Sequence, residues 1–332
     1  MPDQQRLLDI IDRFSTTSVA LIGDLVLDRF ILGTPKRISR EAPVIILRHE
    51  GQRDVPGGAA NALANMAALG LRVTALGALG DDEPGAALRA ALAESGVNTN
   101  ELIVVPGFRT PTKVRILGGG ASSLKHQVAR YDIEDELPDD GGWFNRLLER
   151  LPTIRDCSAL AISDYGYGCV EPGIVEILRQ VVGSDVWITL DSRYRIGEFV
   201  GVDGATPNLE ELEAAVGRRL RGDDEVAAAA SELRTSLGAR FLLATRGNRG
   251  MTLAGDNGNV AHMPVFGSDE VADVTGAGDT VLAVLTAALA SGATTLEGAQ
   301  LANIAAGLVV MKLGTATVTA DELRMALTGT HS

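Results

Sequence analysis

Short apolar runs alternate with amphipathic segments along almost the whole chain. The run Ser18–Gly23 is continuously apolar and ends at Asp24, a pattern typical of a buried strand. Further strands are expected at 73–79, 158–163, 186–191, 240–245 and 250–254. Helical periodicity is expected at the N-terminus and at 58–69, 84–95, 172–182, 209–216, 224–237, 279–291 and 296–311. Buried strands interleaved with helices predict βαβ units and a mostly parallel sheet covered on both faces.

Two segments, at about residues 30–55 and 102–133, break this rhythm. They contain β-rich pieces such as Val44–Leu47 and Lys113–Leu117, with polar alternation and no long helix between them. Such pieces predict a small antiparallel sheet that stands off the main body as a lid. Since no internal repeat or long linker divides the chain, we expect residues 1–332 to form one α/β domain that carries this lid.

Composition and charge narrow the classes of function. The net charge is −13, with 43 acidic residues against 30 basic ones. This global field works against binding to nucleic acid or to an anionic membrane surface. Aromatic residues make up only 4% of the chain, which argues against an aromatic stacking platform. An anionic ligand would therefore need local cations or backbone N–H groups.

Cysteine and histidine usage favours neither a disulfide framework nor a metal centre. Cys157 and Cys169 are the two cysteines and form no CxxC pair. The histidines show no metal-ligand spacing; they are His49, His126, His262 and His331. The N-terminal segment lacks the apolar core of a signal peptide, and no apolar stretch reaches the roughly 18 residues of a membrane span. The expected compartment is the cytoplasm.

Polar side chains gather where the predicted strands end. Asp24, Asp164 and Asp191 each close an apolar run, and Thr206–Asn208 and Thr245–Gly247 occupy comparable positions. In a parallel sheet these ends share one edge, where open α/β folds bind ligands. A single aspartate at such a place is commonly a helix cap, but several together indicate a site.

The segment Val274–Thr280 (VTGAGDT) carries the clearest chemistry. Its small residues allow backbone N–H groups to approach an anion, and the apolar run 281–290 that follows predicts a buried helix. A helix N-terminus favours phosphate. Asp279 would lie beside this anion site, placed to accept a proton from an attacking hydroxyl. The alternative is purely structural, with Thr275 as an N-cap and the glycines as a turn.

Two further motifs precede helices. Pro56–Asn61 (PGGAAN) pairs two glycines with an amide that could bind hydroxyl groups, although a tight helix entry needs the same glycines. Asn208 and Glu211 lie one helical turn apart, where they could hold hydrated Mg²⁺ or form a capping box. The sequence has no GxxxxGK[ST] loop, and no GxGxxG follows the first strand, which disfavours a P-loop or a nicotinamide-dependent oxidoreductase.

Taken in order, these motifs resemble those of the PfkB, or ribokinase-like, carbohydrate kinases. Pro56–Asn61 is similar to the N-terminal signature of the family, and Asp273–Ala283 is similar to the C-terminal one. Asn208-x-x-Glu211 and Thr245–Gly247 fall between them in the family's order. The resemblance implies a three-layer α/β/α fold with a β-sheet lid, and ATP-dependent phosphorylation of a sugar hydroxyl.

The resemblance also implies roles for individual residues. Asp279 would be the catalytic base, and the backbone amides of Gly276, Ala277 and Gly278 would form the anion hole. Substrate-binding roles are implied for Asp24, Asp28, Gly58 and Asn61. We expect Gly57, Lys113 and Arg193 to bind substrate as well. Nucleotide-binding roles are implied for Asn208, Thr245, Arg246, Gly247 and Asn303, with Glu211 and Asn208 holding Mg²⁺ through water. The resemblance also implies a monovalent-cation site. A homodimer formed through the lid is a further expectation, since the exposed edges of a small sheet need to be paired or covered.

Within the family, the chain is most similar to heptose 7-phosphate kinase domains. Ile22–Asp28, Arg37–Val44 and Lys312–Thr315 resemble stretches of these domains, which implies the 1-hydroxyl of heptose 7-phosphate as acceptor. Two positions depart from their usual SDYAKG and DPKG motifs, because Tyr167 and Arg193 replace lysines. Cations that could compensate are Arg37, Arg40, Lys113, Arg115 and Arg193. The alternatives are another sugar, sugar phosphate or nucleoside as acceptor, or a non-catalytic sugar-binding regulator.

Overall fold

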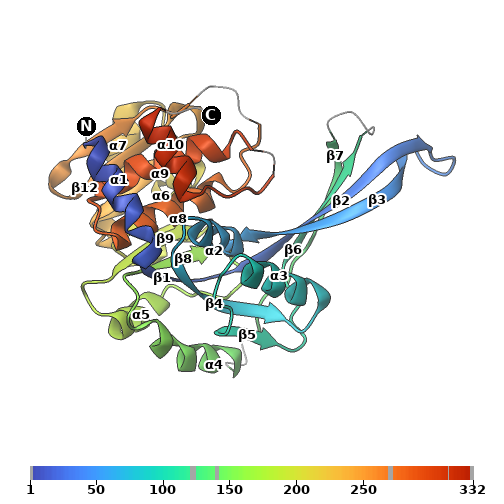
Figure 1. Cartoon of the computed structure of the whole chain (residues 1–332), viewed down its shortest axis with the longest axis horizontal. Coiled ribbons are helices and arrows are strands. Elements are labelled where there is room, and N and C mark those ends of the chain that lie inside the picture. The colour runs from blue at the N-terminus through green and yellow to red at the C-terminus, as the bar shows by residue number, and fades with distance from the viewer. Residues whose placement is uncertain (1–2, 120–124, 139–141, 268–271, 313, 330–332) are drawn as a thin grey trace.

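The computed structural model describes residues 3–119, 125–138, 142–267, 272–312 and 314–329, and Figure 1 shows their arrangement. Residues 120–124 of the expected lid, together with Leu313 and His331, lie outside these ranges. The described residues form a main nine-stranded sheet and a smaller four-stranded sheet.

The main sheet has the strand order β13-β12-β11-β10-β9-β8-β1-β4-β5. The strands from β11 to β5 pair in parallel, and β12 and β13 continue the sheet antiparallel at one edge. The strand bounds are β1 (Ser18–Gly23), β4 (Arg72–Gly80), β5 (Leu102–Val105), β8 (Ala159–Asp164), β9 (Trp187–Ser192), β10 (Gly204–Ala205), β11 (Phe241–Thr245), β12 (Met251–Gly255) and β13 (Val260–Met263).

Helices cover both faces of this sheet. One face packs against α1 (Gln4–Asp12), α2 (Ala59–Ala68), α3 (Glu83–Glu94), α8 (Ala277–Ala290), α9 (Thr295–Val309) and α10 (Ala320–Thr328). The other packs against α4 (Gly142–Arg150), α5 (Ile174–Val182), α6 (Leu209–Val216) and α7 (Asp223–Leu237). Within β1, Val19 and Leu21 join the first core, and Ala20 and Ile22 join the second. Alternate residues thus bury opposite faces, which explains the continuous apolar run.

The small sheet extends away from the body (Figure 1) and has the order β3-β2-β6-β7. Its strands are β2 (Leu25–Ile38), β3 (Ile45–Gly58), β6 (Thr112–Gly118) and β7 (His126–Ile133). Where β2 leaves the body, Arg29 donates to Asp54 on β3 at 2.9 Å and to Glu83 on α3 at 2.8 Å. This cluster of charges ties the base of the lid to the main body.

The predicted α/β/α architecture with a lid is confirmed, and two details of the expected lid are wrong. Leu102–Val105 is not part of the lid, because this apolar run is buried and pairs in parallel with β4 at the edge of the main sheet. The lid is also mixed, since β2 and β6 pair in parallel. Elements that the pattern did not predict include β10, β13, α4 and α10. None of the described helices combines the length and the apolar character that crossing a bilayer requires.

Candidate active site

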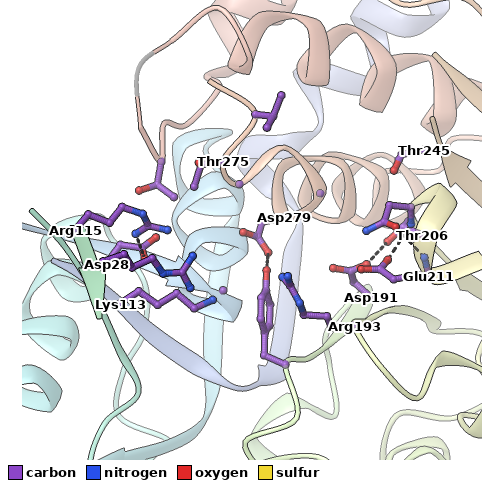
Figure 2. Close-up of a pocket in the computed structure, with 18 residues that line it drawn as sticks. Asp28, Lys113, Arg115, Asp191, Arg193, Thr206, Glu211, Thr245, Thr275 and Asp279 are labelled. Carbon is purple, nitrogen blue, oxygen red and sulfur yellow. Dashed lines mark hydrogen bonds and ion pairs between the residues drawn. The ribbon is translucent and has the colours of Figure 1, made fainter. Parts of the chain in front are cut away.

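A polar cavity of about 340 Å³ lies where the carboxyl ends of the central strands meet the base of the lid. Figure 2 shows Asp279 near its centre, with the lid residues Lys113 and Arg115 on one side and residues of the main sheet on the other. Its polar lining consists of Asp28, Lys113, Arg115, Arg130, Tyr165, Asp191, Arg193, Thr206, Asn208, Glu211, Thr245, Thr275, Asp279 and Thr315. The cavity therefore lies at the carboxyl ends of the parallel strands, where the sequence predicted a ligand site.

A second cavity, of about 170 Å³, adjoins the first and is mainly apolar. Thr245, Val274 and Gly278 line both cavities. The remaining apolar lining of the second cavity is Met251, Val265, Ala277, Val281, Ala306 and Val310. An apolar slot beside a polar chamber suits a ligand with a flat, apolar end and a charged end.

The loop before α8 presents the helix N-terminus to both cavities. Gly276 is the N-cap residue, has φ of 80° and makes no side-chain capping bond. A Cβ at this position would lie 2.4 Å from Asn61 Nδ2, so the close approach requires glycine. Upstream, the Asp273 carboxylate accepts from the N–H groups of Thr275 and Gly314, at 2.9 and 3.1 Å, and holds the loop in place. The first N–H groups of a helix have no acceptor within it; that of Ala277 donates at 3.3 Å to the Val274 carbonyl of the preceding loop, and this end can receive an anion.

Asp279 lies in the first turn of α8 and is only 3% exposed. Asn61 Nδ2 donates to its Oδ2 at 2.9 Å, and the Tyr165 hydroxyl donates to its Oδ1 at 2.8 Å. Burial raises the pKa of Asp279 to about 6, while hydrogen bonds from Asn61 and Tyr165 favour the ionised form and limit the rise. The result is a carboxylate poised near neutral pH, as a general base requires.

A buried network fixes the amide of Asn61. Its Oδ1 accepts from Asn65 Nδ2 at 3.2 Å, which leaves Nδ2 directed at Asp279. The Oδ1 of Asn65 in turn accepts from the Thr280 hydroxyl and from the Val318 N–H, both at 3.2 Å. Asn61 was expected to contact the substrate, yet it is not among the described residues lining the polar cavity, and its amide is occupied by the base. Here it orients Asp279.

Asp24 also has a different position from the one expected of a substrate ligand. Its carboxylate accepts backbone N–H groups of Tyr165, Tyr167 and Cys169, at 2.7, 3.1 and 3.0 Å. Burial raises the pKa of Asp24 to about 6, against the effect of these three donors. Asp24 is buried and absent from the described lining of the cavity, so its side chain holds the loop after β8.

Four cationic side chains line the polar cavity: Lys113, Arg115 and Arg130 from the lid strands, and Arg193 from the segment after β9. Arg115 pairs with Asp28, whose carboxylate fits because Gly57 has no Cβ to contact it. Arg130 pairs with Asp132 at 2.6 Å. Among the described residues, Lys113 and Arg193 form no ion pair with a carboxylate, and burial lowers the pKa of Lys113. The cavity thus carries cationic groups that are not neutralised by pairing.

A group of acidic and amide side chains lines the opposite end. Asn208 and Glu211 form the capping box of α6, with bonds of 2.9 Å in each direction. Burial and then repulsion by Glu211 raise the pKa of Asp191 well above its ordinary value, and burial also raises that of Glu211. A cation would relieve this cost. Within the described residues no cluster of three or more acidic, histidine or cysteine side chains that could hold a metal ion occurs.

Three of the residues expected to bind nucleotide lie at the apolar cavity. Thr245, Gly247 and Asn303 line it, and Asn303 donates to the Pro264 carbonyl at 2.8 Å. Arg246 does not belong to this group. Its side chain turns into the protein, where it pairs with Asp223 and donates to Thr252 Oγ1 at 3.1 Å, so the structure contradicts its expected contact with nucleotide.

Sequence reasoning missed several residues of the site. Arg130, Tyr165 and Asn65 were not proposed, and Asp191 was noted only as a strand end. Arg193 does line the cavity, whereas Arg37 and Arg40 are exposed on the outer part of the lid. The position of Asp191 at the carboxyl end of a parallel strand was a usable signal. Arg130 and Tyr165 reach the site from a lid strand and a loop, which local pattern does not reveal.

Comparison with known proteins identifies relatives across the chain. The profile of the "pfkB family carbohydrate kinase" matches residues 16–133 and 191–322. "Bifunctional protein HldE" of Nitrosococcus oceani is 44% identical over 318 residues, covering 95% of this chain and 64% of the relative. The protein of the same name from Halorhodospira halophila is 42% identical, with the same coverage. The chain thus spans about two thirds of the length of these relatives.

Solved structures share the fold at low sequence identity. Ribokinase of Arabidopsis thaliana, complexed with ribose and ATP, has a TM-score of 0.72 at 20% identity, covering 94% of this chain and 98% of its own. Phosphofructokinase-2 of Escherichia coli, in complex with substrates and products, has a TM-score of 0.76 at 21% identity, covering 94% and 99%. These similarities confirm the arrangement of sheet, helices and lid.

Proposed function

The chain belongs to the pfkB family of carbohydrate kinases, and on this premise we propose that it transfers the γ-phosphoryl group of ATP to a hydroxyl of a phosphorylated sugar. Heptose 7-phosphate, accepting at its 1-hydroxyl, is the proposed substrate. The observation that carries this proposal is the polar cavity, where a buried carboxylate in the first turn of α8 faces cations that have no carboxylate partner among the described residues.

In the proposed reaction, Asp279 acts as general base. One carboxylate oxygen accepts the proton of the acceptor hydroxyl as its oxygen forms a bond to the γ-phosphorus and the bond from that phosphorus to the bridging oxygen of ADP breaks. The backbone amides of Gly276, Ala277 and Gly278 would stabilise the charge on the transferred group. Asn61 and Tyr165 hold the carboxylate but leave lone pairs on both oxygens, so a substrate hydroxyl can still donate to it.

The cations support a phosphorylated acceptor. Lys113 and Arg193 lack carboxylate partners among the described residues, and Lys113 is held in a partly desolvated position where its charge is costly. A phosphate dianion would stabilise both charges through charge-assisted hydrogen bonds. Asp28 and Gly58, on the same side of the cavity, are proposed to contact the sugar itself.

The apolar cavity is proposed to receive the adenine ring, with Thr245, Gly247 and Asn303 at its edge. The phosphates would then pass Thr245 and Gly278, which line both cavities, toward the N-terminus of α8. Glu211, Asp191 and Asn208 would hold hydrated Mg²⁺, which supplies charge neutralisation for the phosphates when bound. Since one solved relative, phosphofructokinase-2 of Escherichia coli, is in complex with potassium, activity should also be compared in potassium and tetramethylammonium salts.

The test is an acceptor panel with purified protein and a coupled assay of ADP release. We expect phosphorylation of heptose 7-phosphate in preference to free heptose, hexose phosphates, pentoses and nucleosides. Lys113→Met should raise KM for the phosphorylated acceptor at least tenfold, the order of one charge-assisted bond, and leave KM for ATP unchanged. Lys125→Met is the matched control, because Lys125 pairs with Glu50 on the lid and is not part of the described lining. Equal use of phosphorylated and free sugars would refute the assignment of acceptor.

We also propose a homodimer formed through the lid. Its two edge strands are β3 and β7, and the lid carries large exposed apolar side chains at Ile38, Val44, Ile45, Val128 and Tyr131. Apolar groups at a free sheet edge favour pairing with a second copy. The cytoplasm is the proposed compartment, consistent with free and buried Cys157 and Cys169.

A further inference from the structure

Tyr165 connects the loop after β8 to Asp279. Its hydroxyl donates to Oδ1 of that carboxylate at 2.8 Å, on the oxygen opposite the one that Asn61 occupies. Burial raises the pKa of Tyr165 well above its ordinary value, so the phenol remains protonated and acts as a donor throughout the physiological range. The carboxylate is therefore held by one donor on each side, from two different parts of the chain.

The position of Tyr165 is set by its backbone. The N–H of Tyr165 donates to Asp24 at 2.7 Å, and two further N–H groups of the same loop donate to that carboxylate. Gly166 N–H donates to Asp164 Oδ1 at 3.1 Å, and Arg195 bridges Asp164 and Glu171 below the loop. These bonds fix the loop, so the phenol oxygen has little freedom to leave the base.

The ring of Tyr165 is also held from the lid side. The Nζ of Lys113 lies 5.1 Å from the ring centroid, within the range of a cation–π interaction. Besides Tyr165, the ionisable groups that act on Asp279 are Asp28 and Lys113 from the lid strands and Asp191 from β9. Arg193 also acts on the phenol, whose pKa it lowers. Among the described ionisable side chains, Tyr165 alone forms a hydrogen bond with Asp279.

We propose that Tyr165 is a positioning residue for the proposed phosphoryl transfer: its hydroxyl fixes the orientation of Asp279 and keeps that carboxylate ionised, so that the base accepts a proton at neutral pH. This inference rests on the proposed function for its catalytic consequence. The hydrogen bond itself is a property of the free protein and can be tested there. Asp24 then contributes to the reaction indirectly, because its carboxylate holds the loop that carries Tyr165.

The variant Tyr165→Phe keeps the ring and its contact with Lys113 and removes only the donor to Asp279. Loss of one donor to a buried carboxylate should raise the pKa of Asp279 by about one pH unit. The acid limb of the profile of kcat/KM against pH should move up by the same amount. At pH 6 the variant should lose about fivefold through protonation alone, and this part of the loss should vanish at pH 8.5.

Tyr167→Phe is the matched control. Tyr167 lies two residues further along the same loop, and its hydroxyl donates to Glu134 at 2.9 Å instead of to the base. It is absent from the described lining of the polar cavity. The same chemical change there should leave the pH profile in place, along with KM for ATP. A purely structural contribution of the loop would affect both variants without a dependence on pH.

The pKa of Asp279 can be measured directly in the free protein by carbon-13 NMR of labelled aspartate carboxyls, with the signal assigned by its loss in Asp279→Asn. A pKa that rises in Tyr165→Phe but not in Tyr167→Phe supports the proposal. An unchanged Asp279 titration in Tyr165→Phe overturns it. If the titration shifts while the wild-type protein phosphorylates no acceptor of the panel, the positioning contact stands and the proposed function fails; these two failures are therefore distinguishable.

Discussion

Replacing Asp279 by asparagine should inactivate the protein and stabilise it at the same time. Asparagine mimics the protonated carboxyl but accepts no proton, so turnover should fall by about 10²–10⁴-fold, the contribution of a positioned general base. The free energy of unfolding should rise, because the wild-type carboxylate is ionised in a buried site. The increase in the free energy of unfolding comes from removing a buried charge, and the asparagine does not have to form any new contact.

The magnitude follows from the pKa of Asp279, which is raised from 3.8 to about 6. This rise corresponds to about 3 kcal/mol of cost for the ionised form, at 1.36 kcal/mol for each pH unit. Below pH 3.8 the carboxyl is protonated in both folded and unfolded chains, and the cost is absent. It grows mainly as the pH rises from 3.8 to 6 and is complete by about pH 8, because between these two pKa values the folded state binds more protons than the unfolded chain.

The assay is urea unfolding of wild type and Asp279→Asn at pH 8 and at pH 4.5. The variant should be more stable by about 3 kcal/mol at pH 8 and by less than half that difference at pH 4.5, where the wild-type carboxyl is largely protonated in the folded state. Asp81→Asn, at an exposed position, controls for the change of net charge alone. A difference in stability that does not depend on pH would refute the burial argument. Turnover close to wild type would refute the assignment of Asp279 as base.

Two further predictions concern the helix entry and the lid. Gly276→Ala places a Cβ 2.4 Å from Asn61 Nδ2 at φ of 80°, so we expect a loss of about 1–2 kcal/mol in unfolding free energy and of most activity. Gly278→Ala, whose Cβ would meet no atom within 4 Å, should be near neutral for stability, and equal losses in both would contradict this. For the lid, Ile45→Asp should shift sedimentation at micromolar concentration from dimer to monomer, whereas Val260→Asp on the body should not. A wild-type monomer under these conditions would exclude the proposed interface.

Much of the fold could be predicted because local patterns carry it. The apolar run Ser18–Gly23 is buried on both faces, so its sequence alone indicates a central strand. β10 has only two residues, which leaves too little periodicity to detect. α4 does carry an amphipathic pattern, with Trp143 and Leu147 buried one turn apart, so this helix could have been predicted from the sequence. Leu102–Val105 was assigned to the lid because an apolar run of four does not say which sheet it joins; its pairing with β4 decides that.

The site was predictable in part for a related reason. Motifs such as Thr275–Asp279 lie on one turn of chain, so sequence spacing fixes their geometry, and this segment does line the cavities. Partners distant in sequence cannot be found this way. Asp24 and Asn61 were both recognised as site residues, but their hydrogen bonds to a loop 141 residues away and to Asp279 became visible only with the fold. The sequence motifs identified Asp24 and Asn61 as residues of the site, whereas the tertiary contacts showed what their side chains bind.

The shared wall between the two cavities has a consequence for inhibition. Thr245, Val274 and Gly278 line both chambers, so the apolar slot and the polar chamber are immediate neighbours. A single molecule that joins an adenosine to a phosphorylated sugar through a short phosphate chain would fill both at once. Linking the two ends makes the second binding event intramolecular, which raises affinity without any new contact. Such a bisubstrate compound would derive its selectivity from Lys113 and Arg193 at the sugar end, while the adenosine end supplies affinity common to many kinases.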